Sequence, residues 1–323
     1  MPPEAFLRRN QALKLRAVFP STTAAALTSL ATGEWPSDHG LPAWWTYLTE
    51  WELTATVLPF VERFSEQPLR RFGVSPEQVF VAEPLLPRYT IAARSFLPRR
   101  IADSAYSAYV RGPTPVSGYG KLAAGVDEVI EFVRSASGPS FSYLYTEQVD
   151  AAAHSEGPES ETVGKALAEV DGELGRLAGA LQEHARIIVS ADHGMLAVAE
   201  ADKSVLRPGD PLLELLVAPP FGEPRVPFFL PRPGQGDRFQ ACFRKRFRDR
   251  FALLTREEAV ALQLFGPAPP SAQVRSRFGE FIALAKGSEV LIYQEEAEGG
   301  TAALRGYHAG LTPAEMRIPL VVA

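Results

Sequence analysis

Hydrophobic and polar positions alternate most regularly in residues 161–184, where apolar side chains recur every three or four positions. This spacing predicts an amphipathic helix that packs on a sheet through one apolar stripe. The residues of the stripe are Val163, Leu167, Val170, Leu174, Leu177 and Leu181. Pro158 and Ser160 mark the start of the helix, and His184 near its end is interpreted as structural.

A short apolar run at residues 187–190 follows this helix and predicts a buried strand. The other expected strands are residues 13–19, 141–145, 288–293 and 318–322, and the other expected helices are residues 24–32 and 126–133. Strand 141–145, helix 161–184 and strand 187–190 form a βαβ unit, so we expect the two strands to be parallel.

This alternation of strands and helices predicts an α/β fold with a mostly parallel central sheet and helices on both faces. The alternation fades at residues 205–290, where prolines are dense. We therefore expect a core at residues 1–204 and 291–323, with residues 205–290 inserted as a smaller α+β cap lobe. The basic run that begins at Arg244 is interpreted as the solvated face of a helix, with Phe243, Phe247 and Phe251 turned inward.

The composition excludes several classes of protein. Of the 323 residues, 46% are hydrophobic and 22% are charged, as in ordinary globular chains, and the net charge of −5 does not favour nucleic acid binding. The single cysteine, Cys242, excludes a disulfide framework and a cysteine-based zinc site. No stretch approaches the roughly 20 apolar residues of a membrane span, and residues 1–10 lack the apolar core of a signal peptide. As written, the chain is expected to be cytoplasmic.

Three hydroxyl side chains, Ser21, Thr22 and Thr23, stand where the first strand gives way to helix 24–32. They have two interpretations. Ser21 or Thr22 caps the helix, or the three hydroxyls and the free N–H groups of the helix N-terminus receive a phosphate. Trp44, in the following aromatic cluster, either lines a pocket or fills the core.

Three of the five histidines, His154, His193 and His308, lie in expected loops next to predicted strands. Together with Asp150 and Asp192 they offer imidazole and carboxylate ligands, which suit divalent metal ions. Two ions about 4 Å apart can hold the attacking and leaving oxygens of a phosphoryl transfer. A threonine or serine oxygen beside such an ion is a candidate nucleophile.

These residues carry a resemblance to the type I phosphodiesterase/nucleotide pyrophosphatase family of the alkaline phosphatase superfamily. Four stretches resemble its motifs in the family's order: Phe19-Pro20-Ser21-Thr22-Thr23 with Thr32-Gly33, Pro36 and His39-Gly40; residues 150–158; residues 191–195; and residues 308–316 with Pro319. Together they span residues 18–321. The resemblance implies an alkaline phosphatase-like fold with the cap lobe described above.

The resemblance also implies two divalent metal ions as cofactors. Asp150, His154 and His308 would hold one zinc ion, and Asp192 and His193 would hold the other. Oxygen and nitrogen ligands of this kind also accept Mn²⁺ or Fe²⁺.

The implied nucleophile is Thr23, which would bind the second ion and form a phospho-threonine intermediate. Thr22 is the alternative nucleophile if the match is shifted by one residue, and Thr22 and Trp44 are the candidate substrate-binding residues. The implied partner is a small phosphate ester, and the implied activity is hydrolysis of that ester.

Two positions depart from the family pattern. The family places an aspartate ligand on a first strand before the nucleophile, whereas the only acid before Thr23 here is Glu4. That strand is therefore expected to be missing, either because the sequence as given begins late or because the protein lacks the strand, and its absence would leave a gap or an exposed edge in the sheet. The family also places an asparagine about where Trp44 falls. These departures leave two alternatives open: a catalytically impaired metal-binding homologue, and a phosphonate or phosphomonoester hydrolase of the same superfamily.

Overall fold

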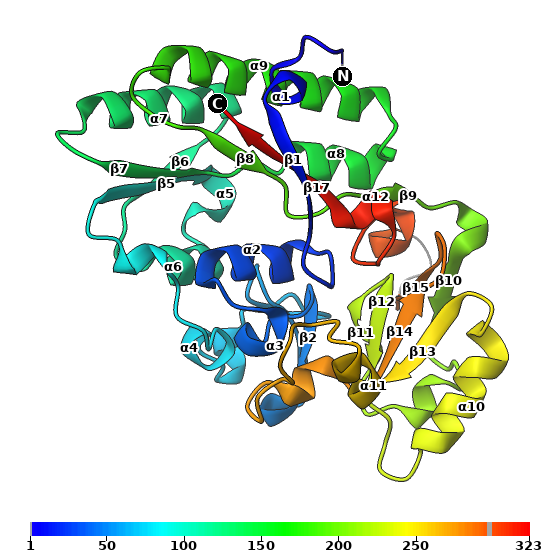
Figure 1. The fold of residues 1–323 in the computed structure, drawn as a ribbon. Coiled ribbons are helices and arrows are strands. Elements are labelled where there is room, and N and C mark those ends of the chain that lie inside the picture. Colours follow the sequence, from blue (N-terminus) through cyan, green and yellow to red (C-terminus); the bar gives the residue numbers. More distant parts are fainter. Residues whose placement is uncertain (1, 296–298) are drawn as a thin grey trace.

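The computed structural model describes residues 2–295 and 299–323 and has the expected α/β fold (Figure 1). Its helices are α1 (Phe6–Arg9), α2 (Thr23–Thr32), α3 (Pro36–His39), α4 (Pro76–Val79), α5 (Arg99–Ala102), α6 (Ala105–Arg111), α7 (Leu122–Ser135), α8 (Gln148–Glu156), α9 (Glu161–Leu181), α10 (Gly236–Phe247), α11 (Arg256–Ala261) and α12 (Pro313–Met316). Its strands are β1 (Gln11–Arg16), β2 (Trp45–Leu48), β3 (Leu53–Thr56), β4 (Val61–Glu62), β5 (Ala92–Pro98), β6 (Val116–Tyr119), β7 (Ser140–Leu144), β8 (Ile188–Ser190), β9 (Leu196–Ala197), β10 (Lys203–Leu206), β11 (Phe221–Glu223), β12 (Val226–Phe229), β13 (Phe251–Thr255), β14 (Phe281–Ala285), β15 (Val290–Tyr293), β16 (Gly306–Tyr307) and β17 (Arg317–Val322).

The core contains two three-stranded sheets, which α7 and α9 cover on one side while α2 lies on the other (Figure 1). In the first sheet, ordered β6-β5-β7, all pairs are parallel. In the second, ordered β1-β17-β8, both pairs are antiparallel. Apolar side chains from α7, α9 and strands of both sheets form one hydrophobic cluster. The parallel arrangement is therefore realised in only part of the core.

The strands before and after α9, which are expected to be parallel, do not pair with each other among the described residues. Strand β7 pairs with β5, and β8 pairs with β17. Consecutive strands are neighbours in only about two-thirds of cases, so a long helical connection does not compel pairing. Strand β8 is consequently an edge strand, and Ile188 on it is 66% exposed.

Helix α9 begins as predicted and ends three residues earlier than the sequence indicates. The side chain of Ser160 caps it by accepting a hydrogen bond from the Val163 N–H. The buried side chains include Val170, Leu174 and Leu177, as the apolar stripe requires. His184 lies beyond the last helical residue.

Residues 205–290 contribute most of a seven-stranded antiparallel sheet, ordered β13-β14-β12-β11-β2-β3-β4, with α10 and α11 beside it (Figure 1). Three of its strands, β2 to β4, come from residues 45–62, so this sheet crosses the expected boundary of the cap lobe. Phe243, Phe247 and Phe251 are buried, which confirms the interpretation of the basic run. No helix in the described ranges is both long enough and apolar enough to cross a membrane.

Candidate functional site

The predicted site residues converge at one end of the core sheets. Thr23 begins α2, Asp150 and His154 lie on α8, Asp192 and His193 follow β8, and His308 follows β16. The sequence indicated a loop for His154, but it occupies the last turn of α8, one helical turn after Asp150. Four separate elements thus supply a single cluster of side chains.

The histidines of this cluster are in close contact. The rings of His193 and His308 are stacked with centroids 3.7 Å apart, and the ring of His154 is 5.1 Å from that of His308. Asp150, His193 and His308 each offer one ligand atom, and these three atoms lie within 4.8 Å of one another. That separation suits ligands of one metal ion or of two neighbouring ions.

All three histidines are oriented through Nδ1. This atom lies 2.8 Å from the Gly306 carbonyl oxygen in His154, 2.9 Å from that of Gly194 in His193, and 3.0 Å from that of Ser21 in His308. A carbonyl oxygen can only accept, so Nδ1 carries a proton in each ring, and in a neutral ring Nε2 then carries the lone pair. Backbone carbonyls orient metal-binding histidines in the same way.

Burial changes the titration of two members of the cluster. It raises the pKa of Asp150, and it lowers the pKa of His308 well below its ordinary value, with His193 and His154 adding to the latter effect. His308 is therefore held neutral, which is the form that binds a metal ion. Asp150 Oδ1 is buried and has no hydrogen-bond partner among the described residues; His154 Nε2 is 3.5 Å away. A buried oxygen with no hydrogen bond is costly unless a further group binds it.

The three hydroxyls before and at the start of α2 point in different directions. Ser21 donates to the Gly310 carbonyl at 2.8 Å, and Thr22 donates to Glu223 Oε1 at 2.6 Å. Thr22 is the N-cap residue, yet its side chain makes no capping hydrogen bond, so the capping interpretation is wrong. Thr23 Oγ1 lies 3.1 Å from His193 Nε2, inside the histidine cluster.

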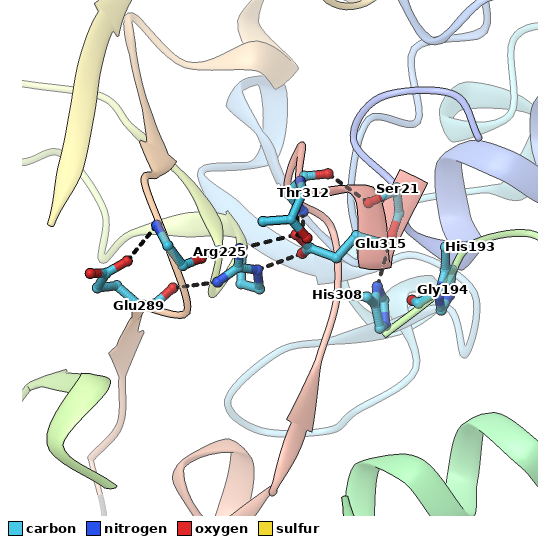
Figure 2. A network of polar contacts seen from close by, with 10 residues as sticks. Ser21, His193, Gly194, Arg225, Glu289, His308, Thr312 and Glu315 are labelled. Atoms are coloured by element: carbon cyan, nitrogen blue, oxygen red, sulfur yellow. Dashed lines mark hydrogen bonds and ion pairs between the residues drawn. The ribbon is translucent and has the colours of Figure 1, made fainter. Parts of the chain in front are cut away.

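The loop that carries His308 is attached to the cap lobe by a buried ion pair. Arg225 and Glu315 are both fully buried, and the Glu315 carboxylate accepts two hydrogen bonds from Arg225, at 2.5 and 3.0 Å (Figure 2). Glu315 also accepts from the Gly310 N–H and from Thr312. Two further N–H groups of Arg225 donate to the carbonyls of Gly287 and Glu289.

Two residues that contact the site were not singled out from the sequence, namely Glu223 and Arg225. They are the only charged residues between Leu215 and Pro231, a segment otherwise rich in apolar residues and proline. Two charged residues inside an otherwise apolar segment indicate buried charges that need polar partners, since charged residues are almost never fully buried unless paired. Glu223 Oε1 also accepts the Trp44 backbone N–H at 2.7 Å, which places partly buried Trp44 next to the nucleophile turn, residues 21–23.

Comparison with known proteins gives a family match over most of the chain. The family described as type I phosphodiesterase / nucleotide pyrophosphatase matches residues 5–219. A 65-residue stretch is 46% identical to mouse ectonucleotide pyrophosphatase/phosphodiesterase family member 3. This stretch covers 19% of the chain and 7% of that relative's length.

Solved structures share the fold at low sequence identity. Murine ectonucleotide pyrophosphatase / phosphodiesterase 5 superposes with a TM-score of 0.68 at 19% identity, over 96% of this chain and 78% of the other. Phosphonoacetate hydrolase from Sinorhizobium meliloti 1021, in complex with phosphonoformate, gives 0.68 at 17% identity, over 98% and 82%. These likenesses show that the chain shares its fold with these proteins.

Proposed function

Because the chain belongs to the type I phosphodiesterase/nucleotide pyrophosphatase family, we propose that it is a metal-dependent hydrolase of phosphoric esters with Thr23 as its nucleophile. The observation that carries this proposal is the orientation of the three histidines. His154, His193 and His308 each use Nδ1 on a backbone carbonyl and present Nε2 toward the cluster that contains Thr23.

We propose that the site holds two divalent ions, and that these are zinc. Asp150, His154 and His308 would hold one ion, and Asp192, His193 and Thr23 would hold the other. The buried, unpartnered Asp150 Oδ1 supports this, because a cation would satisfy it. The proximity of Asp150, His193 and His308 agrees with two adjacent groups of ligands.

When bound, such ions supply positive charge that stabilises the oxygens of a phosphoryl group during its transfer. The chain itself supplies the nucleophile and a cradle for the phosphate. Thr23 Oγ1 attacks phosphorus, and the ester alcohol leaves with the proton that Thr23 gives up, so the phosphoryl group is now bound to threonine. Water then cleaves the bond between phosphorus and Thr23, which restores the hydroxyl and releases phosphate from a monoester or a phosphate monoester from a diester.

Two features support Thr23 over Thr22 as the attacking residue. The Thr22 hydroxyl is committed to Glu223, and Thr22 is only 1% exposed, whereas Thr23 is partly exposed and faces the histidines. Thr23 also occupies the first turn of α2, whose N–H groups have no partners within the helix and attract anionic oxygens.

The test combines metal content with hydrolysis of three probes: bis(4-nitrophenyl) phosphate, 4-nitrophenyl phosphate and phosphonoacetate. We expect about two metal ions per chain and turnover of at least one of the two aryl esters, with the faster one naming the ester class. Turnover of phosphonoacetate alone would identify a phosphonate hydrolase instead. Thr23→Ala should abolish turnover and retain metal. The matched control Thr32→Ala, at the far end of α2, should keep turnover. One ion or fewer without turnover would instead identify a catalytically impaired homologue, and full activity in Thr23→Ala would refute the nucleophile.

A further inference from the structure

Strand β11 of the cap lobe places a buried carboxylate against the nucleophile turn. Glu223 Oε1 accepts two hydrogen bonds, one from the Thr22 hydroxyl at 2.6 Å and one from the Trp44 backbone N–H at 2.7 Å. Glu223 is the last residue of β11, and Thr22 is directly before Thr23. A single oxygen atom therefore joins three segments that are distant in the sequence.

This contact is shielded from water. Glu223 is 6% exposed and Thr22 is 1% exposed. Burial raises the pKa of Glu223 to about 7, against the lowering effects of its two hydrogen bonds and of the nearby charges of His193 and Arg63. Buried hydrogen bonds of this kind are costly to break, because the donors left behind find no other acceptor.

The Thr22 hydroxyl is used in a way that helix formation does not require. An N-cap threonine normally turns its oxygen toward the N–H groups of the first turn, but Thr22 makes no capping hydrogen bond. Its hydroxyl is instead donated to Glu223, so Glu223 fixes the direction in which the chain enters α2. That direction decides where Thr23 Oγ1 lies relative to His193 Nε2, now 3.1 Å away.

We propose that Glu223 is a positioning residue for the reaction of Thr23, acting through the Thr22 hydroxyl and the Trp44 N–H. The proposal rests on the function proposed above. Glu223 holds the nucleophile in line for attack and makes no contact with the reacting atoms itself. Misplacement of a reacting group by about 1 Å costs on the order of 100-fold in rate, so the effect falls on kcat.

The experiment compares Glu223→Gln, Glu223→Leu, Thr22→Val and the double variant Glu223→Leu/Thr22→Val on the better of the two aryl esters. Glu223→Gln keeps an oxygen acceptor and should retain kcat to within about threefold. Glu223→Leu and Thr22→Val should each lower kcat about 100-fold, with KM and metal content little changed. The double variant should be no slower than the slower single variant, because both remove one interaction.

Two control variants make the same chemical changes away from the nucleophile turn. Glu62→Gln alters a carboxylate on β4 that accepts the Phe64 and Ser65 N–H groups. Thr54→Val alters a buried threonine on β3. Both should leave kcat unchanged.

The outcomes separate this inference from the proposed function. If the wild-type protein turns over substrate and Glu223→Leu has a near-normal kcat, the positioning role is overturned and the proposed function stands. The same holds if Glu223→Gln and Glu223→Leu lower kcat equally. Absence of wild-type turnover overturns the proposed function and, with it, this inference. If Glu223→Leu does not fold, Thr22→Val decides: a normal kcat in that variant overturns the positioning role.

Discussion

The buried pair Arg225–Glu315 offers a quantitative test of how the cap lobe supports the His308 loop. Both residues are fully buried, and Arg225 donates to Glu315 and to the carbonyls of Gly287 and Glu289. Arg225→Met keeps an apolar stem of similar length and leaves the Glu315 carboxylate buried without its counter-charge. Removing one partner of such a pair costs about 3–5 kcal/mol in the free energy of unfolding. That loss is a large part of the roughly 5–15 kcal/mol that stabilises a typical protein.

Urea and thermal unfolding of the metal-free protein would measure the loss. We expect Arg225→Met to lower the melting temperature by on the order of 10 °C, given about 2–4 °C per kcal/mol for a large domain. Arg225→Met/Glu315→Gln should recover part of this, because the isolated charge is gone while the amide still accepts the Gly310 N–H. The control Arg246→Met breaks a more exposed pair with Asp210 and should cost about 1 kcal/mol or less.

The same variants test whether the Arg225–Glu315 pair affects metal binding at the candidate site. Glu315 also accepts from Thr312, in the loop between His308 and β17, so we expect Arg225→Met to lose metal more readily than the Arg246→Met control does. An unfolding free energy of Arg225→Met within 1 kcal/mol of wild type would refute the reasoning, because it would mean that Glu315 needs no counter-charge.

Two further predictions concern stability away from that pair. Burial lowers the pKa of His39 to about 3, so folded His39 stays neutral while the unfolded chain gains a proton below about 6.5. Stability is therefore lost as the pH falls from about 6.5 toward 3, by about 2 kcal/mol between pH 7 and pH 5, and urea titrations should find this contribution missing in His39→Gln. A Cβ at Gly194 would lie 1.9 Å from the Ala314 carbonyl oxygen, so Gly194→Ala should displace His193 and reduce metal content on elemental analysis. Gly164→Ala, whose added carbon meets nothing within 4 Å on α9, should instead be neutral or stabilise by about 1 kcal/mol, and a similar metal loss in both variants would contradict the steric argument.

The elements that local pattern determines were predictable from the sequence. Helix α9 shows its apolar stripe and its cap within 25 residues, and α2 is closed by Gly33 in the left-handed conformation, as the sequence indicates. The candidate ligands were found for a similar reason. Imidazole and carboxylate side chains are typical metal ligands, and three of the five histidines lie in expected loops near glycine, aspartate or glutamate, so residue type and order in the chain indicate the candidates.

The pairing of strands that are distant in the sequence could not be predicted from local sequence patterns. Strand β8 is only three residues long, and its partner β17 comes more than a hundred residues later. The cap lobe sheet likewise recruits β2, β3 and β4 from before the core helices, and no periodicity in residues 45–62 distinguishes that sheet from the core sheets. Each segment can satisfy its own pattern in several topologies, and only the packing of the whole chain selects one.

Glu223 and Arg225 show that contacts between distant segments, which local sequence does not predict, are important at the candidate site. Each reads locally as a charge on a proline-rich loop, where solvent exposure is the ordinary expectation. Their burial follows from a strand pair whose connecting turn enters the space between the nucleophile turn and the His308 loop. The candidate ligands are thus recognisable from residue type, whereas Glu223 and Arg225 become neighbours of the site only through the fold. Glu223 binds the residue before Thr23, and Arg225 binds Glu315, which in turn accepts from the loop after His308. Residues of the cap lobe therefore support both of these candidate site segments.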